Sequence, residues 1–210
     1  MESPVCASDT RLIETFGWNG EAFVRLDQHL NRLQTSAKTL GFAYDPQKIA
    51  LVLATVTGQS PQRIRLTLGQ KGDLDLTCTP LTAAPTQWVL TLAPERLVSD
   101  NPLLAHKTTE RALYDQTRAA LAKGIDEAIF ANERSEICEG TITSLFFDLG
   151  GGLATPPLRC GCLPGVLRAE LLSTGQCQEA ILHLSDLRRA RLWVGNALRG
   201  LIPAVLAGSD

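Results

Sequence analysis

Three positions of this 210-residue chain carry residues that could take part in binding or catalysis. Lys107 stands in the irregular stretch "SDNPLLAHK", directly before a segment with helical periodicity. Glu139 stands near the start of the apolar run "ICEGTITSLFFDL", and a carboxylate that enters a buried strand is costly unless a specific group pairs with it. Gly165 in "GCLPGVLR" leads into a helix whose free N–H groups can bind an anion. The chain thus offers an amine, a carboxylate and an anion site.

Each feature alone has an ordinary structural explanation. A loop lysine is usually solvated, a carboxylate at a strand end can bond backbone amides, and most helix starts bind no ligand. Together they match pyridoxal phosphate, which needs a lysine for its aldehyde, an anion site for its phosphate and a partner for its ring nitrogen. The lysine would serve as covalent partner and proton carrier. On this interpretation Glu139 pairs with the protonated ring nitrogen, which explains why no basic residue stands within four positions of it.

The first half of the chain alternates between strand and helix patterns. Asn19-Gly20 between apolar runs predicts a hairpin over 10–26. Apolar residues at helical spacing predict a helix over 26–41, and a second helix is predicted over 46–58. Alternating apolar residues then predict strands over 63–69, 73–80 and 88–94. We expect these strands to form an antiparallel sheet with helices on one side.

The second half mixes the same patterns. A helix is predicted over 108–124, with Thr108 as its N-cap. Further helices are predicted over 164–173 and 184–190. Strands are predicted over 127–132, 136–149, 153–157, 191–196 and 200–207. The irregular stretch 94–106 divides the pattern, so we expect a small N-terminal α+β lobe over 1–97 and a C-terminal cofactor-binding α/β lobe over 98–210.

Composition limits the classes of function. A formal net charge of −2 and a pI of about 5.9 give no basic footprint for nucleic acid. No apolar run reaches the roughly 20 residues of a membrane span, and the N-terminus lacks the pattern of a signal peptide. We therefore expect a cytoplasmic protein with reduced cysteines and no membrane partner. The pair in "CGC" (160–162) has the wrong spacing for zinc, so no metal site is expected.

Five segments, in order along the chain, resemble the motifs of a known family. They are "RLDQHLNRL", "HKTTERALYD", "DEAIFANERSEICEGTITSLFF", "LPGVLRAELL" and "VGNALRGLIPA". The family is that of the class IV (fold type IV) pyridoxal-phosphate enzymes, which includes branched-chain aminotransferases, D-amino acid aminotransferases and aminodeoxychorismate lyases. The resemblance runs from Asp9 to Val205 and implies the two-lobed α+β fold of D-amino acid aminotransferase. Because the chain starts almost at "DTRLIETFGW", the N-terminal lobe is expected to be shortened and to lack an edge strand.

The resemblance implies a role for individual residues. Lys107 falls on the lysine that carries the aldehyde, Glu139 on the glutamate at the ring nitrogen, and Arg32 on the arginine that reaches the phosphate. On sequence grounds alone Arg32 would be interpreted as a solvated surface residue of an amphipathic helix, although a guanidinium suits a phosphate. Other cofactor contacts are implied for Thr143, for the backbone of Val166 and Leu167, and for the loop with Asn196, Ala197 and Leu198.

The resemblance also implies a reaction. The segments "CLPGVLR" and "NALRG" are most similar to aminodeoxychorismate lyases, which convert 4-amino-4-deoxychorismate to 4-aminobenzoate and pyruvate on the folate route. Lys107 would then act as base and afterwards as acid. A branched-chain or D-amino acid aminotransferase is the alternative, and it needs a site for the substrate's α-carboxylate. Candidates for carboxylate binding in either case are Arg63, Arg65 and Arg199.

Three further points concern the kind of protein. A non-catalytic family member that acts as a binding protein is a third interpretation, and the presence of both Lys107 and Glu139 argues against it. Two positions depart from the family, because Glu110 and Ser144 stand where asparagine is common. Members of the family are generally dimers with the site near the interface, so the resemblance implies a homodimer.

Overall fold

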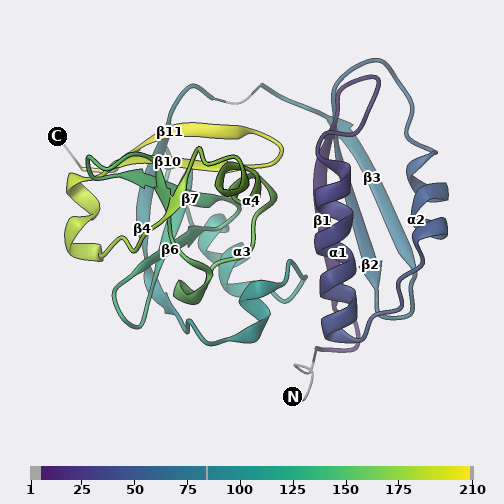
Figure 1. Cartoon of the computed structure of the whole chain (residues 1–210), viewed down its shortest axis with the longest axis horizontal. Coiled ribbons are helices and arrows are strands. Elements are labelled where there is room, and N and C mark those ends of the chain that lie inside the picture. Colours follow the sequence, from purple (N-terminus) through teal and green to yellow (C-terminus); the bar gives the residue numbers. More distant parts are fainter. Residues whose placement is uncertain (1–5, 84, 209–210) are drawn as a thin grey trace. The chain divides into compact units, whose positions relative to one another are not determined.

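The structure, a computed structural model, describes residues 6–83 and 85–208. These residues form two compact units (Figure 1). The first contains 6–83 together with His106–Glu110, and the second contains 85–105 together with 111–208. The expected lobes over 1–97 and 98–210 also include 1–5, 84 and 209–210, which lie outside the described residues.

The first unit is an antiparallel sheet with two helices. Its strands are β1 (Arg11–Trp18), β2 (Gln62–Gly69) and β3 (Leu74–Pro80), in the order β1-β2-β3. Its helices are α1 (Leu26–Leu40), which packs on β1, and α2 (Pro46–Leu53) (Figure 1). The helix predicted over 26–41 is therefore confirmed. Gly41 ends α1 in the left-handed conformation, with φ of 75°, which glycine adopts without penalty.

Alternation along β2 gives this sheet two different faces. Ile64 and Leu66 are buried on one face, whereas Arg63 and Arg65 lie on the other and are partly exposed. Glu14 on β1 stands directly opposite Leu66. Side chains at directly opposite positions share a face, so β1 places a carboxylate in the apolar row of the sheet.

Two elements predicted for the first unit are wrong in extent. The hairpin over 10–26 is reduced to β1 and a single bridge, because the side chain of Asn19 accepts two following N–H groups and closes a turn. The helix predicted over 46–58 ends at Leu53. A Thr-Val-Thr sequence follows at 55–57, and β-branched side chains are poor helix formers.

The segment His106–Glu110 belongs to the first unit because it pairs with the edge of β1. The N–H of Ile13 donates to the carbonyl oxygen of Lys107 at 2.8 Å, and the N–H of Thr109 donates to that of Arg11 at 2.9 Å. Lys107 is therefore attached to β1 through its backbone.

Because of this pairing, the next helix starts later than predicted. Thr108 bridges to β1 and is not the N-cap of a helix over 108–124, so that prediction is wrong at its start. The helix, α3, is limited to Ala112–Ala119 and has Arg111 at its N-cap. Hydrogen bonding to a strand edge satisfies backbone groups that a longer helix would otherwise have used.

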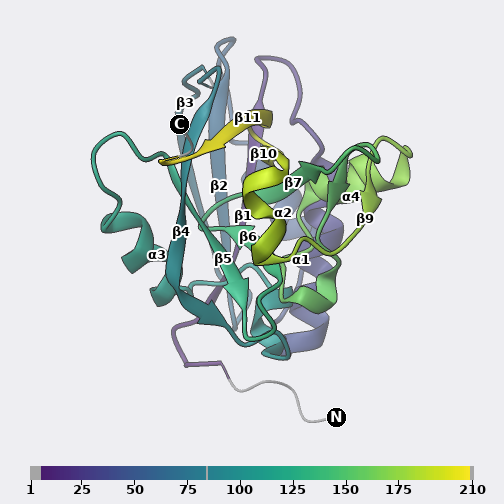
Figure 2. The same ribbon diagram turned by 90° about the vertical axis from the view of Figure 1, so that its left-hand side faces the viewer.

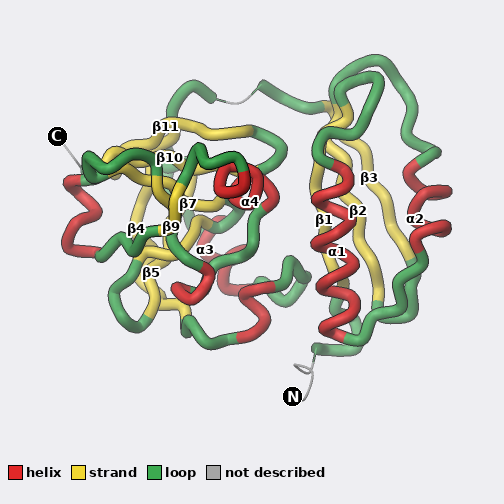
Figure 3. Tube along the Cα trace, in the orientation of Figure 1, coloured by secondary structure: helices red, strands yellow, loops and turns green. Residues whose placement is uncertain are grey.

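The second unit is built on one sheet (Figure 3). Its strands are β4 (Trp88–Leu97), β5 (Glu127–Asn132), β6 (Ile137–Gly140), β7 (Ser144–Asp148), β8 (Ala154–Thr155), β9 (Gln178–Glu179), β10 (Arg191–Asn196) and β11 (Gly200–Leu206). Their order is β10-β11-β4-β5-β6-β7-β8-β9, and β10 also pairs with β7. The strands β4 to β7 therefore close into a ring with β10 and β11, which leaves no open edge among them.

The position of β4 corrects one expectation. The sequence placed 88–94 in the antiparallel sheet of the first half, but β4 lies between β5 and β11 of the second unit and is parallel to both. A parallel partner requires a crossover connection, here the one that contains α3. Such a pairing joins strands far apart in sequence and leaves no local signal.

Successive side chains along the strands of the second unit point to opposite faces, so they belong to different clusters of the core. On β5, Ile129 belongs to the cluster shared by all strands of the ring, whereas Phe130 packs on the side of α3. On β7, Leu145 belongs to the ring cluster, and Phe146 packs with Leu167 of α4 (Val166–Ser173). Figure 2 shows α3 and α4 on opposite sides of the strands.

Other predicted elements of the second unit differ in detail. The single strand predicted over 136–149 is two strands, β6 and β7, separated by a turn at 141–143. The helix predicted over 184–190 is a 3-10 helix, Leu184–Arg189. Two further 3-10 helices, Pro102–Ala105 and Leu158–Cys160, were not predicted. The α+β class is confirmed. No helix among the described residues is long and apolar enough to cross a membrane.

Candidate active site

Glu139 lies on β6, one residue before its end, and is buried in the second unit. The hydroxyl of Tyr114 donates to its Oε1 at 2.8 Å, and the backbone N–H of Leu163 donates to its Oε2 at 3.0 Å. These donors stand 25 and 24 positions away in the sequence, which is why no partner was visible beside Glu139. An ionised carboxylate can accept at both of its oxygens, and here each oxygen has a donor.

Tyr114 is held on α3 by two aromatic contacts. Its ring packs edge-on against Phe130, with ring centroids 5.0 Å apart, and the guanidinium of Arg111 lies 5.5 Å from its centroid. Burial and the negative charge of Glu139 raise the pKa of the Tyr114 phenol. The phenol therefore stays protonated at neutral pH and remains a donor to Glu139.

The helix α4 begins three residues after Leu163. Its N-cap is Gly165, which provides no side chain to bond the first N–H groups. A Cβ at this position would lie 2.6 Å from the Oγ of Ser144, so β7 approaches the start of the helix closely. The first N–H groups of a helix lack intrahelical acceptors, and the helix dipole is positive there. The start of α4 therefore suits an anion.

The loop between β10 and β11 is organised by Asn196. Its Oδ1 accepts the N–H groups of Leu198 at 3.1 Å and Arg199 at 3.0 Å. Its Nδ2 donates to the carbonyl oxygen of Ile142 at 3.2 Å, which joins the loop to the turn between β6 and β7. The predicted Asn196 contact to the cofactor therefore falls on a residue that shapes its own loop.

Strand β10, which leads into this loop, packs against α4. A Cβ on Gly195 would lie 2.8 Å from a methyl group of Leu167 and 2.6 Å from the carbonyl oxygen of Gly200. Val166, Leu167 and Ala197 are all buried. The predicted backbone contacts of these residues thus belong to two adjacent segments of the second unit.

A second buried carboxylate fixes the turn that follows β6. Glu127 on β5 is fully buried and accepts the N–H groups of Thr141 at 3.1 Å and Ile142 at 3.2 Å. It also accepts the hydroxyls of Thr141 and of Thr143, the latter at 3.0 Å. Thr143, predicted to contact the cofactor, therefore holds the turn through Glu127. Sequence analysis missed Glu127, although a carboxylate at the start of "EAIFAN" is the same signal that marked Glu139.

Arg32 of the first unit is bound by Glu14. Arg32 donates from Nε to Oε1 at 2.8 Å and from Nη2 to Oε2 at 2.6 Å, and His29 Nδ1 contacts Oε2 at 2.6 Å. Burial acts to raise the pKa of Glu14, but the charge of Arg32 and the hydrogen bonds from His29 and Arg32 outweigh it and hold that pKa below its ordinary value. Because Glu14 is ionised, His29 donates through Nδ1. Arg32 is thus part of a buried network, and sequence analysis missed Glu14 and His29.

The side chain of Lys107 is partly exposed. Nearby in sequence, the departure at Glu110 has a partner, because the hydroxyl of Thr10 donates to its Oε1 at 2.5 Å. The candidates for carboxylate binding fall in different units. Arg65 lies on β2, whereas the guanidinium of Arg199 lies 5.8 Å from the ring centroid of Trp88 in the second unit.

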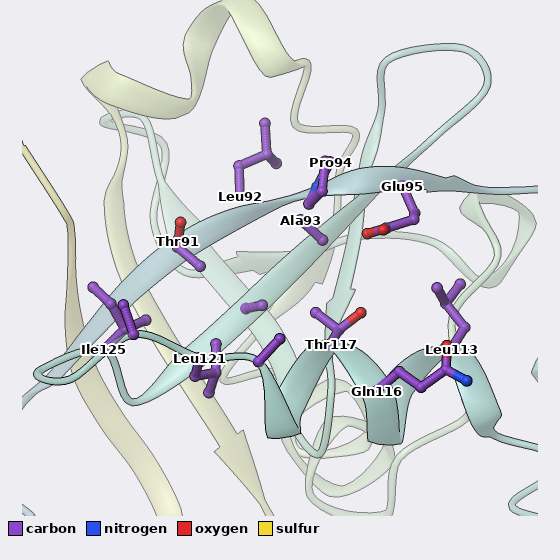
Figure 4. A pocket seen from close by; sticks show the side chains of 13 residues that line it. Thr91, Leu92, Ala93, Pro94, Glu95, Leu113, Gln116, Thr117, Leu121 and Ile125 are labelled. Carbon is purple, nitrogen blue, oxygen red and sulfur yellow. The ribbon is translucent and has the colours of Figure 1, made fainter.

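Two other features of the second unit carry no site chemistry. Buried thiols donate to backbone carbonyls, as in Cys138 to Cys160 at 3.0 Å, and burial raises the pKa of Cys160 to about 12, so this thiol is protonated at neutral pH. A cavity of about 450 Å³ lies between β4 and α3, where Figure 4 shows Thr91, Glu95 and Leu113. Glu139 and the start of α4 do not line it. Among the described residues, no group of three or more His, Cys, Asp or Glu could hold a metal.

The second unit therefore collects most of the predicted cofactor contacts. Glu139, the start of α4 and the loop at Asn196 are joined through Leu163 and through the turn at 141–143. This arrangement fits pyridoxal phosphate, because it combines a buried carboxylate with a glycine-capped helix start. Arg32, Lys107 and Arg65 belong to the first unit.

The chain belongs to the family described as amino-transferase class IV, whose model matches residues 11–206. The resemblance drawn from the sequence motifs is thereby confirmed. Enzymes of this family use pyridoxal phosphate. The match begins at the first residue of β1 and ends at the last residue of β11, so both units lie within it.

Three relatives illustrate the similarity. A Schizosaccharomyces pombe protein described as "Putative aminodeoxychorismate lyase" is 31% identical over 94% of this chain and 90% of its own. A Mesorhizobium loti structure described as a "Putative amino-acid aminotransferase" is 51% identical, with a TM-score of 0.89 over 95% of this chain and 100% of its own. A hypothetical aminotransferase from Mycobacterium tuberculosis in a PLP-bound form shares the fold, with 17% identity and a TM-score of 0.79 over 99% of this chain and 87% of its own.

Proposed function

We propose that the chain is a pyridoxal-phosphate-dependent lyase that converts 4-amino-4-deoxychorismate to 4-aminobenzoate and pyruvate. The observation that best supports this cofactor is the buried carboxylate of Glu139. Donors orient this carboxylate next to the glycine-capped start of α4. A ligand with a basic ring nitrogen and a phosphate needs this pair of groups.

Each predicted contact has a role toward this cofactor. When bound, pyridoxal phosphate withdraws electrons from the carbon that carries the substrate's amino group. The carboxylate of Glu139 would hold the proton at the ring nitrogen, and Lys107 would hold the aldehyde. Thr143 would act by keeping its turn in shape through Glu127. The phosphate would be bound by the N–H groups of Val166 and Leu167, by the loop of Asn196 and Ala197, and by Arg32.

The lyase reaction needs one group that removes a proton and later returns it to the leaving fragment. Lys107 is our candidate, because an unprotonated amine acts as a base and the resulting ammonium acts as an acid. No amino acceptor takes part in this reaction. Support comes from the similarity to the Schizosaccharomyces pombe protein and from the segments "CLPGVLR" and "NALRG".

Transamination is the second candidate, and one observation favours it. The Mesorhizobium loti relative, whose description is that of an amino-acid aminotransferase, has the higher identity to this chain. A transaminase binds the α-carboxylate of its substrate, for which Arg65 and Arg199 are our candidates in either reaction. A guanidinium suits a carboxylate because it offers two parallel N–H donors.

One set of assays separates these candidates. The purified protein is incubated with 4-amino-4-deoxychorismate alone, and separately with L-leucine, L-alanine or D-alanine plus 2-oxoglutarate. Release of 4-aminobenzoate without an amino acceptor supports the lyase, whereas formation of glutamate supports the transaminase. If neither product forms, neither reaction is supported and only the fold assignment remains.

Lys107→Ala tests the covalent contact directly. Borohydride reduction of the loaded wild-type protein should fix the cofactor to the chain. Intact mass should then rise by one pyridoxal phosphate, less the water lost in forming the C=N bond and plus the two hydrogens added by reduction. The Lys107→Ala protein should show no such increase, whereas the control Lys123→Ala should behave as wild type. Labelling of the Lys107→Ala protein would contradict the assignment.

We further propose a cytoplasmic homodimer, on the resemblance to the family. Sedimentation or gel filtration of the purified protein at micromolar concentration tests the assembly. A mass of about 23 kDa, that of one chain, would contradict it, given the chain mass of 22.7 kDa.

A further inference from the structure

Tyr114 donates a hydrogen bond to Glu139, and neighbouring side chains hold the Tyr114 ring in place. Its hydroxyl donates to Oε1 at 2.8 Å, while the ring is confined by Phe130 at 5.0 Å and by the guanidinium of Arg111 at 5.5 Å. Arg111 in turn donates from Nη2 to the carbonyl oxygen of Thr141 at 2.8 Å. The phenol is therefore fixed at both its ring and its hydroxyl, and α3 is tied to the turn that follows β6.

This arrangement determines how Glu139 can move. A carboxylate held by one donor can rotate about its side-chain bonds, but donors on both oxygens restrict that rotation. The second donor, Leu163, belongs to the backbone and stands just before α4. Tyr114 is thus a side-chain donor that restricts this carboxylate, and a substitution can remove its hydroxyl.

We propose that Tyr114 is a positioning residue for the cofactor's ring nitrogen, acting through the carboxylate of Glu139. The hydroxyl does this by keeping the carboxylate in the orientation in which it meets a protonated pyridine. A hydrogen bond from a neutral donor also favours the ionised form of a carboxylate, which is the form that pairs with a pyridinium. This inference rests on the proposed function, because it requires that the chain binds pyridoxal phosphate.

The test compares two ligands that differ at the ring nitrogen. Apoprotein is titrated with pyridoxal phosphate and with its 1-deaza analogue, in which a C–H group replaces that nitrogen. Tyr114→Phe should weaken binding of pyridoxal phosphate by roughly threefold to tenfold, the cost of ordering one side chain on binding. Binding of the 1-deaza analogue should change by less than about twofold, because no proton at the ring nitrogen is involved.

Two controls complete the experiment. Tyr44→Phe removes the hydroxyl of the chain's other tyrosine, which lies in the first unit, and should leave both affinities unchanged. In a Glu139→Gln background, Tyr114→Phe should lose most of its effect, since the residue is argued to act through that carboxylate. An undiminished effect in this background overturns the proposal.

The possible failures are distinguishable. If the wild-type apoprotein binds pyridoxal phosphate and Tyr114→Phe binds it equally well, the positioning role is wrong and the proposed function stands. If Tyr114→Phe weakens both ligands alike, or loses the native melting transition, Tyr114 is structural and the positioning role is wrong. If the wild-type protein binds no pyridoxal phosphate, the proposed function and this inference both fall.

Discussion

The guanidinium of Arg32 binds the carboxylate of Glu14 through two parallel hydrogen bonds, at 2.8 Å from Nε and 2.6 Å from Nη2. Both residues are largely removed from solvent, with 12% of the Arg32 side chain and 1% of the Glu14 side chain exposed. His29 adds a third contact to the same carboxylate, and its Nε2 has no hydrogen-bond partner among the described residues. A guanidinium held in this way is pre-organised for another anion.

Glu14→Gln should destabilise the protein strongly. The substitution keeps the shape of the side chain but removes the buried negative charge that pairs with Arg32. Loss of one member of a buried ion pair costs about 3–5 kcal/mol. The free energy of unfolding, measured with urea, checks this. Asp73→Asn, at an ion pair with Arg11 in which Asp73 is exposed, is the matched control and should have a much smaller effect, because solvent screens exposed ion pairs. Equal effects of the two substitutions would contradict the prediction.

The effect of Glu14→Gln should depend on pH. The pKa of Glu14 is held below its ordinary value of 4.5, so the folded state binds its proton less readily than the unfolded state. The stabilising contribution of Glu14 is therefore present above pH 4.5 and is lost as pH falls through the lower folded pKa. Unfolding free energies of the wild-type and Glu14→Gln proteins should converge in acid below that range. A difference that stays constant throughout the acid range would contradict this assignment.

Arg32→Lys should weaken the binding of pyridoxal phosphate to the apoprotein. A lysine keeps the positive charge but cannot form the two-point bond to Glu14 and has no planar fork for a phosphate. We expect a loss of roughly tenfold or more, as for a charge-assisted hydrogen bond. Arg96→Lys, at an exposed position of β4, is the control and should bind as wild type. Equal binding by Arg32→Lys would place the phosphate contact elsewhere.

The elements that sequence predicted best carry their own local signals. The helix α1 has leucines at helical spacing and a glycine at its C-cap, and β5 and β10 are short apolar runs whose bounds match the prediction at both ends. The errors lie where a partner far along the chain decides the structure. Thr108 pairs with Leu12 instead of capping a helix, and β4 is parallel to two strands that follow it much later in the chain.

In the candidate site too, the sequence identified single residues but not their partners on other elements. A lone carboxylate in an apolar run pointed to Glu139, but its donors Tyr114 and Leu163 come from other elements and no spacing in the sequence connects them. The partner of Arg32 was hidden for a similar reason, because Glu14 lies 18 positions earlier on a strand that reads as apolar. Motifs therefore identify the residues that we propose to meet a ligand more readily than the residues that orient them.

Gly195→Ala should disturb the loop at Asn196 and the helix α4 together. The added Cβ would lie 2.6 Å from the carbonyl oxygen of Gly200 and 2.8 Å from a methyl group of Leu167. The first of these atoms is backbone on the paired strand β11, so no side-chain rotation removes the clash. Overpacking of this kind costs about 1–3 kcal/mol, and the displaced loop should also bind pyridoxal phosphate less tightly.

Thermal or urea unfolding and cofactor titration of the same Gly195→Ala preparation measure both effects. Gly151→Ala is the matched control, because no atom lies within 4 Å of a Cβ built there, and it should leave stability and affinity unchanged. Reduced stability with unaltered affinity would show that the loop does not contribute to phosphate binding. Loss of both would show that phosphate binding depends on the close packing of Gly195, Gly200 and Leu167. Unchanged stability in the Gly195→Ala protein would show that β10 and β11 can move apart, against the tight register that joins Gly195 to Leu201 and Asn196 to Gly200.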